Sequence, residues 1–261
     1  IALNGPIVTI RRFPDKPITM QKLIAMDTLS VEAAEFLKML VKAGYNIFVS
    51  GGTGSGKTTF LNVLSGFIPS EQRIITIEDS AELQLQGLPN LVRLETRNGS
   101  EDGCREIGIR ELIRSSLRMR PDRIIVGEVR GAEAIDMLQC MNTGHDGSMS
   151  TGHANSAADM LSRLENMVLM GMDLPLPAIR NQIASGDIIV HLGRIRDKSR
   201  KVLEITEVIG CENGEIRLNP LYRFEELGES SDGNVVGKLQ KTGGLLHEGK
   251  LKAAGFSGAV S

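Results

Sequence analysis

The chain has 261 residues, of which 41% are hydrophobic and 24% charged, and its 30 basic and 32 acidic side chains give a net charge of -2. A chain of this length buries roughly 70% of its unfolded surface, and this composition excludes a disordered or collagen-like protein. The slightly acidic balance argues against nucleic acid as the main partner, and no apolar run approaches the about 18 residues that cross a bilayer. We therefore expect a globular protein that is soluble or peripherally bound to a membrane.

The cysteines and the first residues indicate a reducing compartment and a missing domain. Cys104, Cys140 and Cys211 are odd in number and far apart, so they predict neither a disulfide framework nor a zinc knuckle. Residues 1–6 have neither the charge nor the apolar run of a signal peptide. We expect residues 1–18 to be the end of an N-terminal domain and its linker, with most of that domain absent.

Residues 19–185 alternate between amphipathic helices and short apolar strands, with Thr19 and Ser30 as predicted helix N-caps. The strands predicted within this range are 47–50, 74–77, 91–95, 123–126 and 148–151, and a further short strand, 8–13, is predicted before it. The predicted longer helices are 58–68, 109–119, 132–141, 157–170 and 175–185. This alternation predicts an α/β fold with a mostly parallel central sheet.

The pattern changes near residue 188, where antiparallel strands are predicted. They are 188–192, 201–209, 215–218 and 221–224, with Glu212-Asn213-Gly214 as a turn between two of them. Eight of the 34 residues in 228–261 are glycine, so we expect a loosely held C-terminal tail there. The predicted core domain is therefore 19–227.

Residues 51–58, GGTGSGKT, match the phosphate-binding pattern GxxxxGK[ST] between a predicted strand and a predicted helix. In such a loop, backbone N–H groups surround phosphate oxygens, Lys57 reaches the β- and γ-phosphates, and the Thr58 hydroxyl ligates Mg²⁺. The alternative is a glycine-rich turn without a ligand. We predict a nucleoside triphosphate site whose binding residues are Gly52, Thr53, Gly54, Ser55, Gly56, Lys57, Thr58 and Thr59.

Acidic residues end two other predicted strands. Glu78 and Asp79 follow strand 74–77, and Glu128 follows strand 123–126, where a Walker B element usually has Asp. Ligands of parallel sheets bind at the carboxyl ends of the strands, so we expect these acids to face the phosphates. The alternative is that Asp79 caps the next segment and Glu78 is merely solvated.

Residues 144–153, GHDGSMSTGH, carry His145 and His153 around another predicted strand. A zinc pair lacks a third ligand at metal spacing, so we expect His153 to hydrogen-bond a γ-phosphate. Residues 93–130 hold nine arginines and no lysine, which suits phosphate contact or a finger across a subunit boundary. The alternative is surface salt bridging to Glu95, Glu101, Glu106 and Glu111.

Four segments, in this order, carry a resemblance: GGTGSGKTT, ITIEDSAEL, LRMRPDRIIVGEVRG and TGHDGSMSTGHANSA. Together they resemble the motor ATPases of bacterial type II and type IV secretion and pilus assembly, above all the CpaF-type ATPase of the Tad (Flp) pilus system. The likeness extends over about residues 9–226. It implies a RecA-like motor domain that hydrolyses ATP with Mg²⁺. It also implies a homohexamer at the cytoplasmic face of the inner membrane, working with an inner-membrane platform protein.

The resemblance also implies residue roles. Lys57 and Thr58 match the Walker A ligands, and Glu78 matches the Asp-box glutamate, the candidate general base. Glu128 matches the Walker B glutamate near Mg²⁺, and with Thr58 it forms the expected metal site. His153 matches the His-box residue nearest the γ-phosphate, and Arg11 a basic linker position beside the nucleotide.

Other functions remain open at this stage. Some secretion and pilus branches usually carry a tetracysteine zinc insert, and its absence favours the Tad or the type IV secretion (conjugation-type) branch. A DNA-handling RecA-like motor would need a basic stripe with aromatic residues, which the chain lacks. A nucleotide-dependent switch would be expected to carry a guanine-reading NKxD motif, which is also missing.

Overall fold

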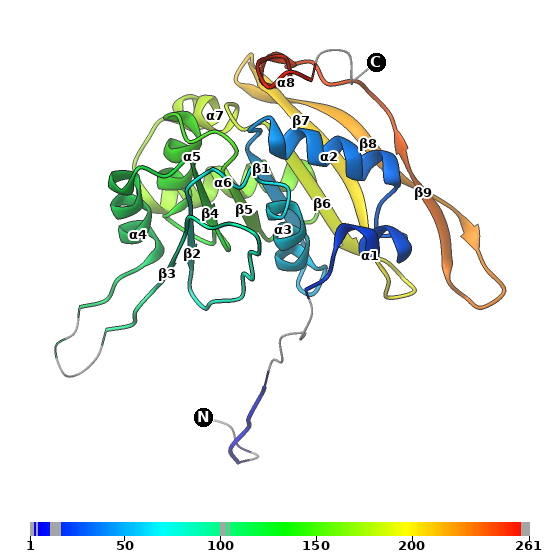
Figure 1. The fold of residues 1–261 in the computed structure, drawn as a ribbon, viewed down its shortest axis with the longest axis horizontal. Helices are drawn as coiled ribbons and strands as arrows, with labels where there is room; N and C mark the ends of the chain where they lie inside the picture. Colours follow the sequence, from blue (N-terminus) through cyan, green and yellow to red (C-terminus); the bar gives the residue numbers. More distant parts are fainter. Residues whose placement is uncertain (1–2, 4, 11–16, 100–102, 104, 257–261) are drawn as a thin grey trace.

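A computed structural model describes residues 3, 5–10, 17–99, 103 and 105–256. One sheet holds nine strands in the order β3-β2-β4-β5-β1-β6-β7-β8-β9, with helices packed against it (Figure 1). The pairings from β3 to β6 are parallel and those from β6 to β9 are antiparallel. The predicted fold class is confirmed, including the change from parallel to antiparallel pairing.

The bounds of β1 to β6 lie close to those expected from sequence. The parallel strands are β1 (Ile47–Gly51), β2 (Ile74–Glu78), β3 (Leu91–Glu95), β4 (Arg123–Val126), β5 (Met149–Gly152) and β6 (Ile188–Arg194). The antiparallel strands are β7 (Arg200–Glu212), β8 (Glu215–Glu229) and β9 (Val235–Lys241).

Eight α-helices are described. They are α1 (Met20–Ala25), α2 (Val31–Lys42), α3 (Lys57–Ser65), α4 (Ile109–Ser116), α5 (Ala134–Asn142), α6 (Ala157–Gly171), α7 (Leu176–Ile183) and α8 (Gly249–Ala253). Thr19 and Ser30 cap α1 and α2 as expected, because their hydroxyls accept from the N–H groups of Lys22 and Ala33.

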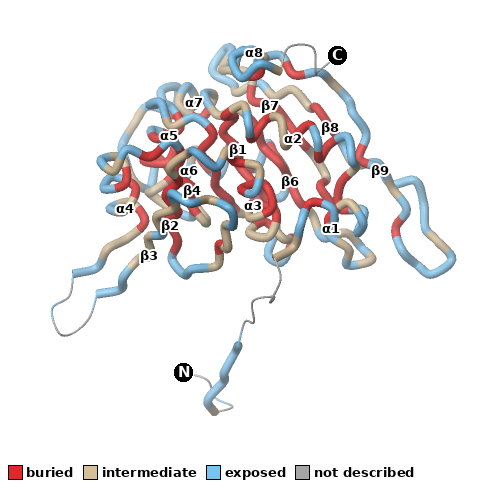
Figure 2. The backbone as a smooth tube through the Cα atoms, in the orientation of Figure 1, coloured by how far each residue is buried: buried red, intermediate tan, exposed pale blue. Residues whose placement is uncertain are grey.

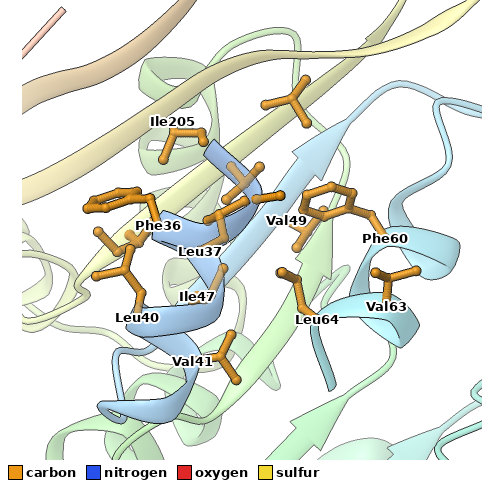
Figure 3. Packing of buried hydrophobic residues seen from close by; sticks show 14 of the residues in the cluster. Phe36, Leu37, Leu40, Val41, Ile47, Val49, Phe60, Val63, Leu64 and Ile205 are labelled. Atoms are coloured by element: carbon orange, nitrogen blue, oxygen red, sulfur yellow. The ribbon is translucent and has the colours of Figure 1, made fainter. Parts of the chain in front are cut away.

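Two apolar clusters lie on opposite faces of the sheet, because successive side chains of a strand point to opposite sides. Ile47 and Val49 of β1 join the cluster beneath α1, α2 and α3, whereas Phe48 joins the one beneath α4 to α7. Figure 3 shows the first cluster, with side chains of α2, β1 and α3 facing one another across the layer. The central strands are buried along most of their length (Figure 2). Burial on both faces explains why these strands read as continuous apolar runs.

The antiparallel half departs from expectation at one point. Residues 215–229 form one strand rather than the two short strands predicted on either side of Asn219 and Pro220. A register shift accommodates the proline, since Ile205 pairs with Tyr222 and Thr206 with Pro220, which leaves Leu221 as an extra residue. Proline lacks an N–H group and is tolerated in sheets at such bulges. The predicted turn is confirmed: Asn213 and Gly214 both have positive φ between paired Glu212 and Glu215.

The glycine-rich segment is not loosely held over residues 228–256, so that expectation was wrong. Leu239, Leu245 and Leu251 are buried in the cluster that includes α2. The Glu207 carboxylate accepts from the N–H groups of Leu246 at 2.9 Å and His247 at 2.7 Å. A few buried leucines and one buried carboxylate anchor this segment, and its glycine count concealed them.

Few predictions for residues 1–18 can be compared with the structure, because residues 1, 2, 4 and 11–16 lie outside the described part. Residues 8–10 are exposed and belong to no strand, so the predicted strand 8–13 is wrong over its described part. Arg11, proposed as a contact of the nucleotide, lies outside the described residues. The proposed boundary after residue 18 therefore stays a prediction.

The central strand β1 ends at a place with no room for a side chain. Gly51 has φ of 155°, and a Cβ there would overlap the backbone carbonyl oxygen of Leu192 in β6 and lie 2.6 Å from Ser55 Oγ. By contrast, a Cβ on the next residue, Gly52, meets no heavy atom within 4 Å. The close approach presses the loop after β1 against β6.

These two glycines therefore make a matched pair for mutagenesis. Gly51→Ala should lower the free energy of unfolding by about 2 kcal/mol or more, because backbone atoms must shift to admit the methyl group. Gly52→Ala should change it by no more than about 0.5 kcal/mol. Urea unfolding followed by circular dichroism measures both, and equal losses in the two variants would contradict the packing at Gly51.

Candidate functional site

The phosphate-binding loop predicted from the sequence joins β1 to α3. The helix begins at Lys57, directly after Gly56, whose φ is 97° and which supplies no side-chain cap. The first N–H groups of a helix have no partner within it, so here they are left for a ligand or solvent. Together with the positive end of the helix dipole, they form a ready site for an anion.

A pocket of about 910 Å³ lies over this loop. Residues 53–59 line it, which includes every loop residue predicted from sequence except Gly52. Because β1 lies between β5 and β6, the pocket has two ends. We call the end lined by Glu128, Arg130 and His153 the β4–β5 end, and the end lined by Lys198, Ser199 and Arg200 the β6 end.

The β4–β5 end gathers three of the predicted functional side chains. Lys57 is buried, and its Nζ donates to the Gly52 carbonyl at 3.1 Å and lies 3.4 Å from His153 Nδ1. His153 Nε2 in turn lies 2.8 Å from Glu128 Oε1. The structure therefore brings Lys57, His153 and Glu128 together, although they come from three separate segments.

Burial and neighbouring charges set the protonation of these groups. Burial lowers the pKa of Lys57, and the Glu128 carboxylate partly opposes that effect. Burial and then the positive charge of Lys57 lower the pKa of His153, so its imidazole is neutral at pH 7. A neutral ring beside a lysine ammonium can accept or donate a hydrogen bond without adding charge.

Arg130 closes this end of the pocket. Its Nε donates to Glu128 Oε2 at 2.6 Å, and its Nη1 lies 3.9 Å from Asp79 Oδ2. Asp79 is half exposed, and the 3.9 Å separation makes this a weak surface pair. Of the acids predicted to face the phosphates, Glu128 therefore forms the shortest ion pair with Arg130, and it also lines the pocket.

Glu78 is buried at the end of β2. It is 4% exposed and is not among the described residues that line the pocket. Its Oε1 accepts from the backbone N–H groups of Glu82 at 2.9 Å and Leu83 at 2.8 Å, while burial raises its pKa. The chain turns back after β2 and Glu78 Oε1 accepts from the amides of that turn, so the predicted role of Glu78 at the phosphates stays a prediction. Glu82 and Gln84 of the same segment line the pocket instead.

The two histidines of residues 144–153 lie at opposite ends of β5. His145 precedes the strand, where its carbonyl accepts from Ser148 Oγ at 2.7 Å, and His153 follows it. Within the part of the chain that the structure describes, no three His, Cys, Asp or Glu side chains gather as a metal site. His153 lines the pocket over residues 53–59.

The residues at the pocket fit a hydrated Mg²⁺ bound together with phosphates. Ser55 Oγ is buried and has no hydrogen-bond partner among the described residues, and the buried Glu128 Oε1 faces His153 Nε2 at 2.8 Å. Thr58 lines the same pocket. Mg²⁺ keeps several waters and takes few protein ligands, so one hydroxyl and one carboxylate suffice when phosphate supplies the rest.

The arginines of residues 93–130 have mixed roles. Arg110 and Arg114 donate to Asp136 at 2.7 and 2.8 Å, rather than to the glutamates considered from the sequence. Arg123 is fully buried and donates to the Val41 carbonyl at 2.7 Å, and desolvation lowers its pKa to about 10. Among these residues, Arg130 is the one that lines the pocket.

Sequence reasoning missed three groups of pocket residues. Arg130 and Glu82 lie within the recognised motifs and were passed over in favour of their neighbours. Ile18, Leu23 and Met26 form an apolar wall, and helical spacing gave no sign that they face a pocket. Lys198, Ser199 and Arg200 follow β6 in a turn that carries no recognised motif.

Comparison with known proteins decides the family. The model of the Type II/IV secretion system protein family matches residues 2–212. The chain belongs to this family. A Mycobacterium tuberculosis protein named for conjugal transfer is 37% identical over 243 residues, which cover 93% of this chain and 68% of that protein. The type IV secretion system protein PtlH of Bordetella pertussis is 42% identical over 177 residues, 66% of this chain and 52% of PtlH.

Solved structures that resemble this chain have the same fold. The VirB11 ATPase of the Brucella suis type IV secretion system superposes with a TM-score of 0.61 at 37% identity, covering 73% of this chain and 56% of VirB11. The pilus retraction motor PilT gives a TM-score of 0.54 at 23% identity, which supports the fold alone. This chain thus has the RecA-like domain that its motifs implied. It spans little more than half of the length of VirB11. Among its described residues, no helix is long and apolar enough to span a bilayer.

The buried lysine gives the first prediction for this site. Lys57→Ala should weaken ATP binding at least tenfold, because it removes a charged donor to phosphate. The melting temperature without nucleotide should stay within about 3 °C of wild type, since the lost ammonium is itself poorly solvated. Isothermal titration and thermal unfolding measure the two effects. A variant that unfolds more easily yet binds ATP normally would contradict the assigned role.

The coupling between Lys57 and His153 gives the second prediction. Lys57→Ala should raise the pKa of His153, because the lysine charge opposes protonation of the ring. The pKa of buried His191, which desolvation also lowers, should not change, since Lys57 does not act on it. NMR titration of the imidazole nitrogens measures both residues in one sample. Equal shifts of the two histidines, or none at His153, would rule out the coupling.

Proposed function

We propose that this chain is the motor domain of an ATPase that hydrolyses ATP to drive secretion or pilus assembly across a bacterial envelope. The observation that supports it most is the pocket over residues 53–59, where Lys57, Glu128 and His153 meet beside an uncapped helix N-terminus. A glycine-rich turn without a ligand would not need a buried lysine whose pKa is lowered.

The reacting phosphate would lie at the β4–β5 end. Lys57 leaves the Gly52 carbonyl and binds the β- and γ-phosphates, and neutral His153 donates a hydrogen bond to the γ-phosphate. Glu128 is positioned to orient the attacking water and take its proton, with Arg130 holding the other carboxylate oxygen. When bound, Mg²⁺ would neutralise charge on the phosphates. Thr58 would supply a hydroxyl ligand, and Glu128 would accept hydrogen bonds from the waters around the ion.

The assembly and partners extend the proposal. We infer a homohexamer at the cytoplasmic face of the inner membrane, in which an arginine of one subunit completes the site of its neighbour. The exposed arginines of residues 93–130 are the candidates, and an inner-membrane platform protein is the partner that receives the motion. These inferences rest on family membership rather than on contacts within the chain.

The most specific part of the proposal is the type of secretion or pilus system that the ATPase serves. Relatives named for conjugal transfer and for type IV secretion support the conjugation-type branch. The likeness of the four motifs to the CpaF-type ATPase of the Tad system supports a pilus motor. We keep both, and we place a DNA-handling RecA-like motor behind them because the net charge is -2.

The two glutamates give the test of the catalytic assignment. Glu128→Gln should lower the rate of ATP turnover by about 10² or more while ADP affinity stays within a few-fold of wild type. Glu78→Gln should lower turnover by less than about tenfold, because an amide oxygen can still accept from the two backbone N–H groups. Steady-state ATPase assays over a range of Mg²⁺ and protein concentrations measure both effects.

The protein-concentration series also reports on assembly, since a site completed by a neighbour turns over faster as subunits associate. If Glu78→Gln were the more damaged variant, the assignment of Glu128 as the water-orienting residue would be wrong. If neither variant nor the wild type hydrolysed ATP at any concentration, the proposed function itself would fail.

A further inference from the structure

The turn between β6 and β7 touches the phosphate-binding loop from the side opposite Glu128. Arg200, the first residue of β7, donates from Nε to the carbonyl oxygen of Gly54 at 2.8 Å. Its Cδ also lies 3.4 Å from where a Cβ on Gly56 would be. Arg200 therefore packs along the loop and forms a hydrogen bond with it.

The turn that carries Arg200 is rigidly built. The Asp197 carboxylate accepts from the N–H groups of Ser199 at 2.7 Å and Val235 at 2.8 Å, and the bonds from Ser199 lower its pKa to about 2. Ile195 and Lys198 close the turn with backbone hydrogen bonds of 3.0 and 2.9 Å. This bracing fixes the start of β7, so the position of Arg200 is set before any ligand arrives.

Most of the Arg200 guanidinium is still available for a ligand. Its Nη1 and Nη2 have no hydrogen-bond acceptor among the described residues, and the side chain lines the pocket. Beside it, the Ser199 hydroxyl also lines the pocket, next to the Asp197 carboxylate that it bonds. The free guanidinium groups of Arg200 therefore lie at the β6 end with a second polar side chain.

The layout of the pocket says which part of a nucleotide meets them. Lys57, Glu128 and His153 hold the γ-phosphate end at β4–β5, while the apolar wall of Ile18, Leu23 and Met26 suits a base. The phosphate nearest the ribose then lies between these regions, over the loop whose Gly54 carbonyl Arg200 binds. Arginine is well matched to such a phosphate, because its fork can bond a backbone carbonyl and an anion at once.

We propose that Arg200 is a positioning residue that acts within its own subunit: it orients the Gly54–Ser55 peptide and donates from its free Nη groups to the α-phosphate of the bound nucleotide. This inference rests on the proposed function, since it presumes that the pocket binds a nucleotide. It assigns to the antiparallel part of the sheet a direct share in binding, which the motifs of the parallel part do not indicate.

Nucleotide binding by matched arginine variants tests this role. Arg200→Gln should raise the Kd for fluorescent ADP and ATP analogues about tenfold, and equally for the two, since both carry the α-phosphate. The rate at saturating ATP should fall less than about threefold, so the effect appears in KM rather than kcat. Arg200→Lys, which keeps the charge but not the fork, should recover part of the affinity.

Arg196→Gln is the control, because this arginine belongs to the same turn but bonds Glu226 and Glu229 and is not among the described pocket-lining residues. It should bind both analogues as wild type does. Wild-type affinity of Arg200→Gln, equal losses in Arg196→Gln, or a fall in kcat without a change in KM would each overturn the assignment. Should Arg200→Gln fail to fold, Arg200→Lys decides instead: an equal rise in Kd for the ADP and ATP analogues supports the role, and wild-type affinity overturns it.

The same titration separates the role of Arg200 from the proposed nucleotide site on which it rests. If Lys57→Ala loses ATP binding and Arg200→Gln does not lose affinity, the role of Arg200 is refuted and the nucleotide site stands. If Lys57→Ala binds ATP as wild type does, the proposed function fails first.

Discussion

The absence of a side chain at Gly51 is the constraint on which the site depends. A Cβ there would overlap the carbonyl of Leu192 in β6, so only glycine lets β1 run straight into a loop that lies against β6. Two consequences follow from that close approach. The loop turns sharply enough for α3 to begin at Lys57, with its N-terminus at the sheet edge. The start of β7 also comes within hydrogen-bond reach of Gly54. Backbone packing thus builds the anion site before any charged side chain contributes.

Charge is then distributed so that the four groups at the β4–β5 end keep one uncompensated positive charge, that of Lys57. Lys57 carries a positive charge in a place where burial disfavours it, and its donor is occupied by the Gly52 carbonyl. Glu128 is balanced by Arg130, and His153 stays neutral between Lys57 and Glu128. An arriving phosphate offers Lys57 a better partner than a loop carbonyl, and its charge relieves the cost of the buried ammonium. Binding energy is therefore concentrated on the phosphates.

Much of this was readable from sequence, and the exceptions have physical causes. Strands and helices were found because burial on both sheet faces produces apolar runs, and Lys57, Glu128 and His153 converge because parallel strands end at one edge. Glu78 also ends a parallel strand, yet it is buried and is not among the described pocket-lining residues, because its carboxylate accepts from two amides of the turn after β2. A position at the end of a strand predicts that a carboxylate lies near the ligand edge of the sheet. It does not predict which neighbouring groups donate hydrogen bonds to that carboxylate.

Arg200 was beyond sequence reasoning for a different reason. Its position depends on the register of β7 against β6, which includes an irregularity between His191 and Leu192, and on a turn braced by a distant segment at Val235. The anchoring of residues 228–256 was likewise hidden, since it depends on the partners of Glu207 and on three leucines dispersed among glycines. Long-range register and isolated buried anchors leave little trace in local patterns.

The orientation of the nucleotide across the sheet edge is the central claim of this account. A structure of the protein with Mg²⁺ and a slowly hydrolysed ATP analogue tests it most directly. The account predicts the terminal phosphate within hydrogen-bond distance of Lys57 and next to Glu128, with the base against Ile18, Leu23 and Met26. A nucleotide lying in the reverse direction, or density for it elsewhere than over residues 53–59, would contradict it.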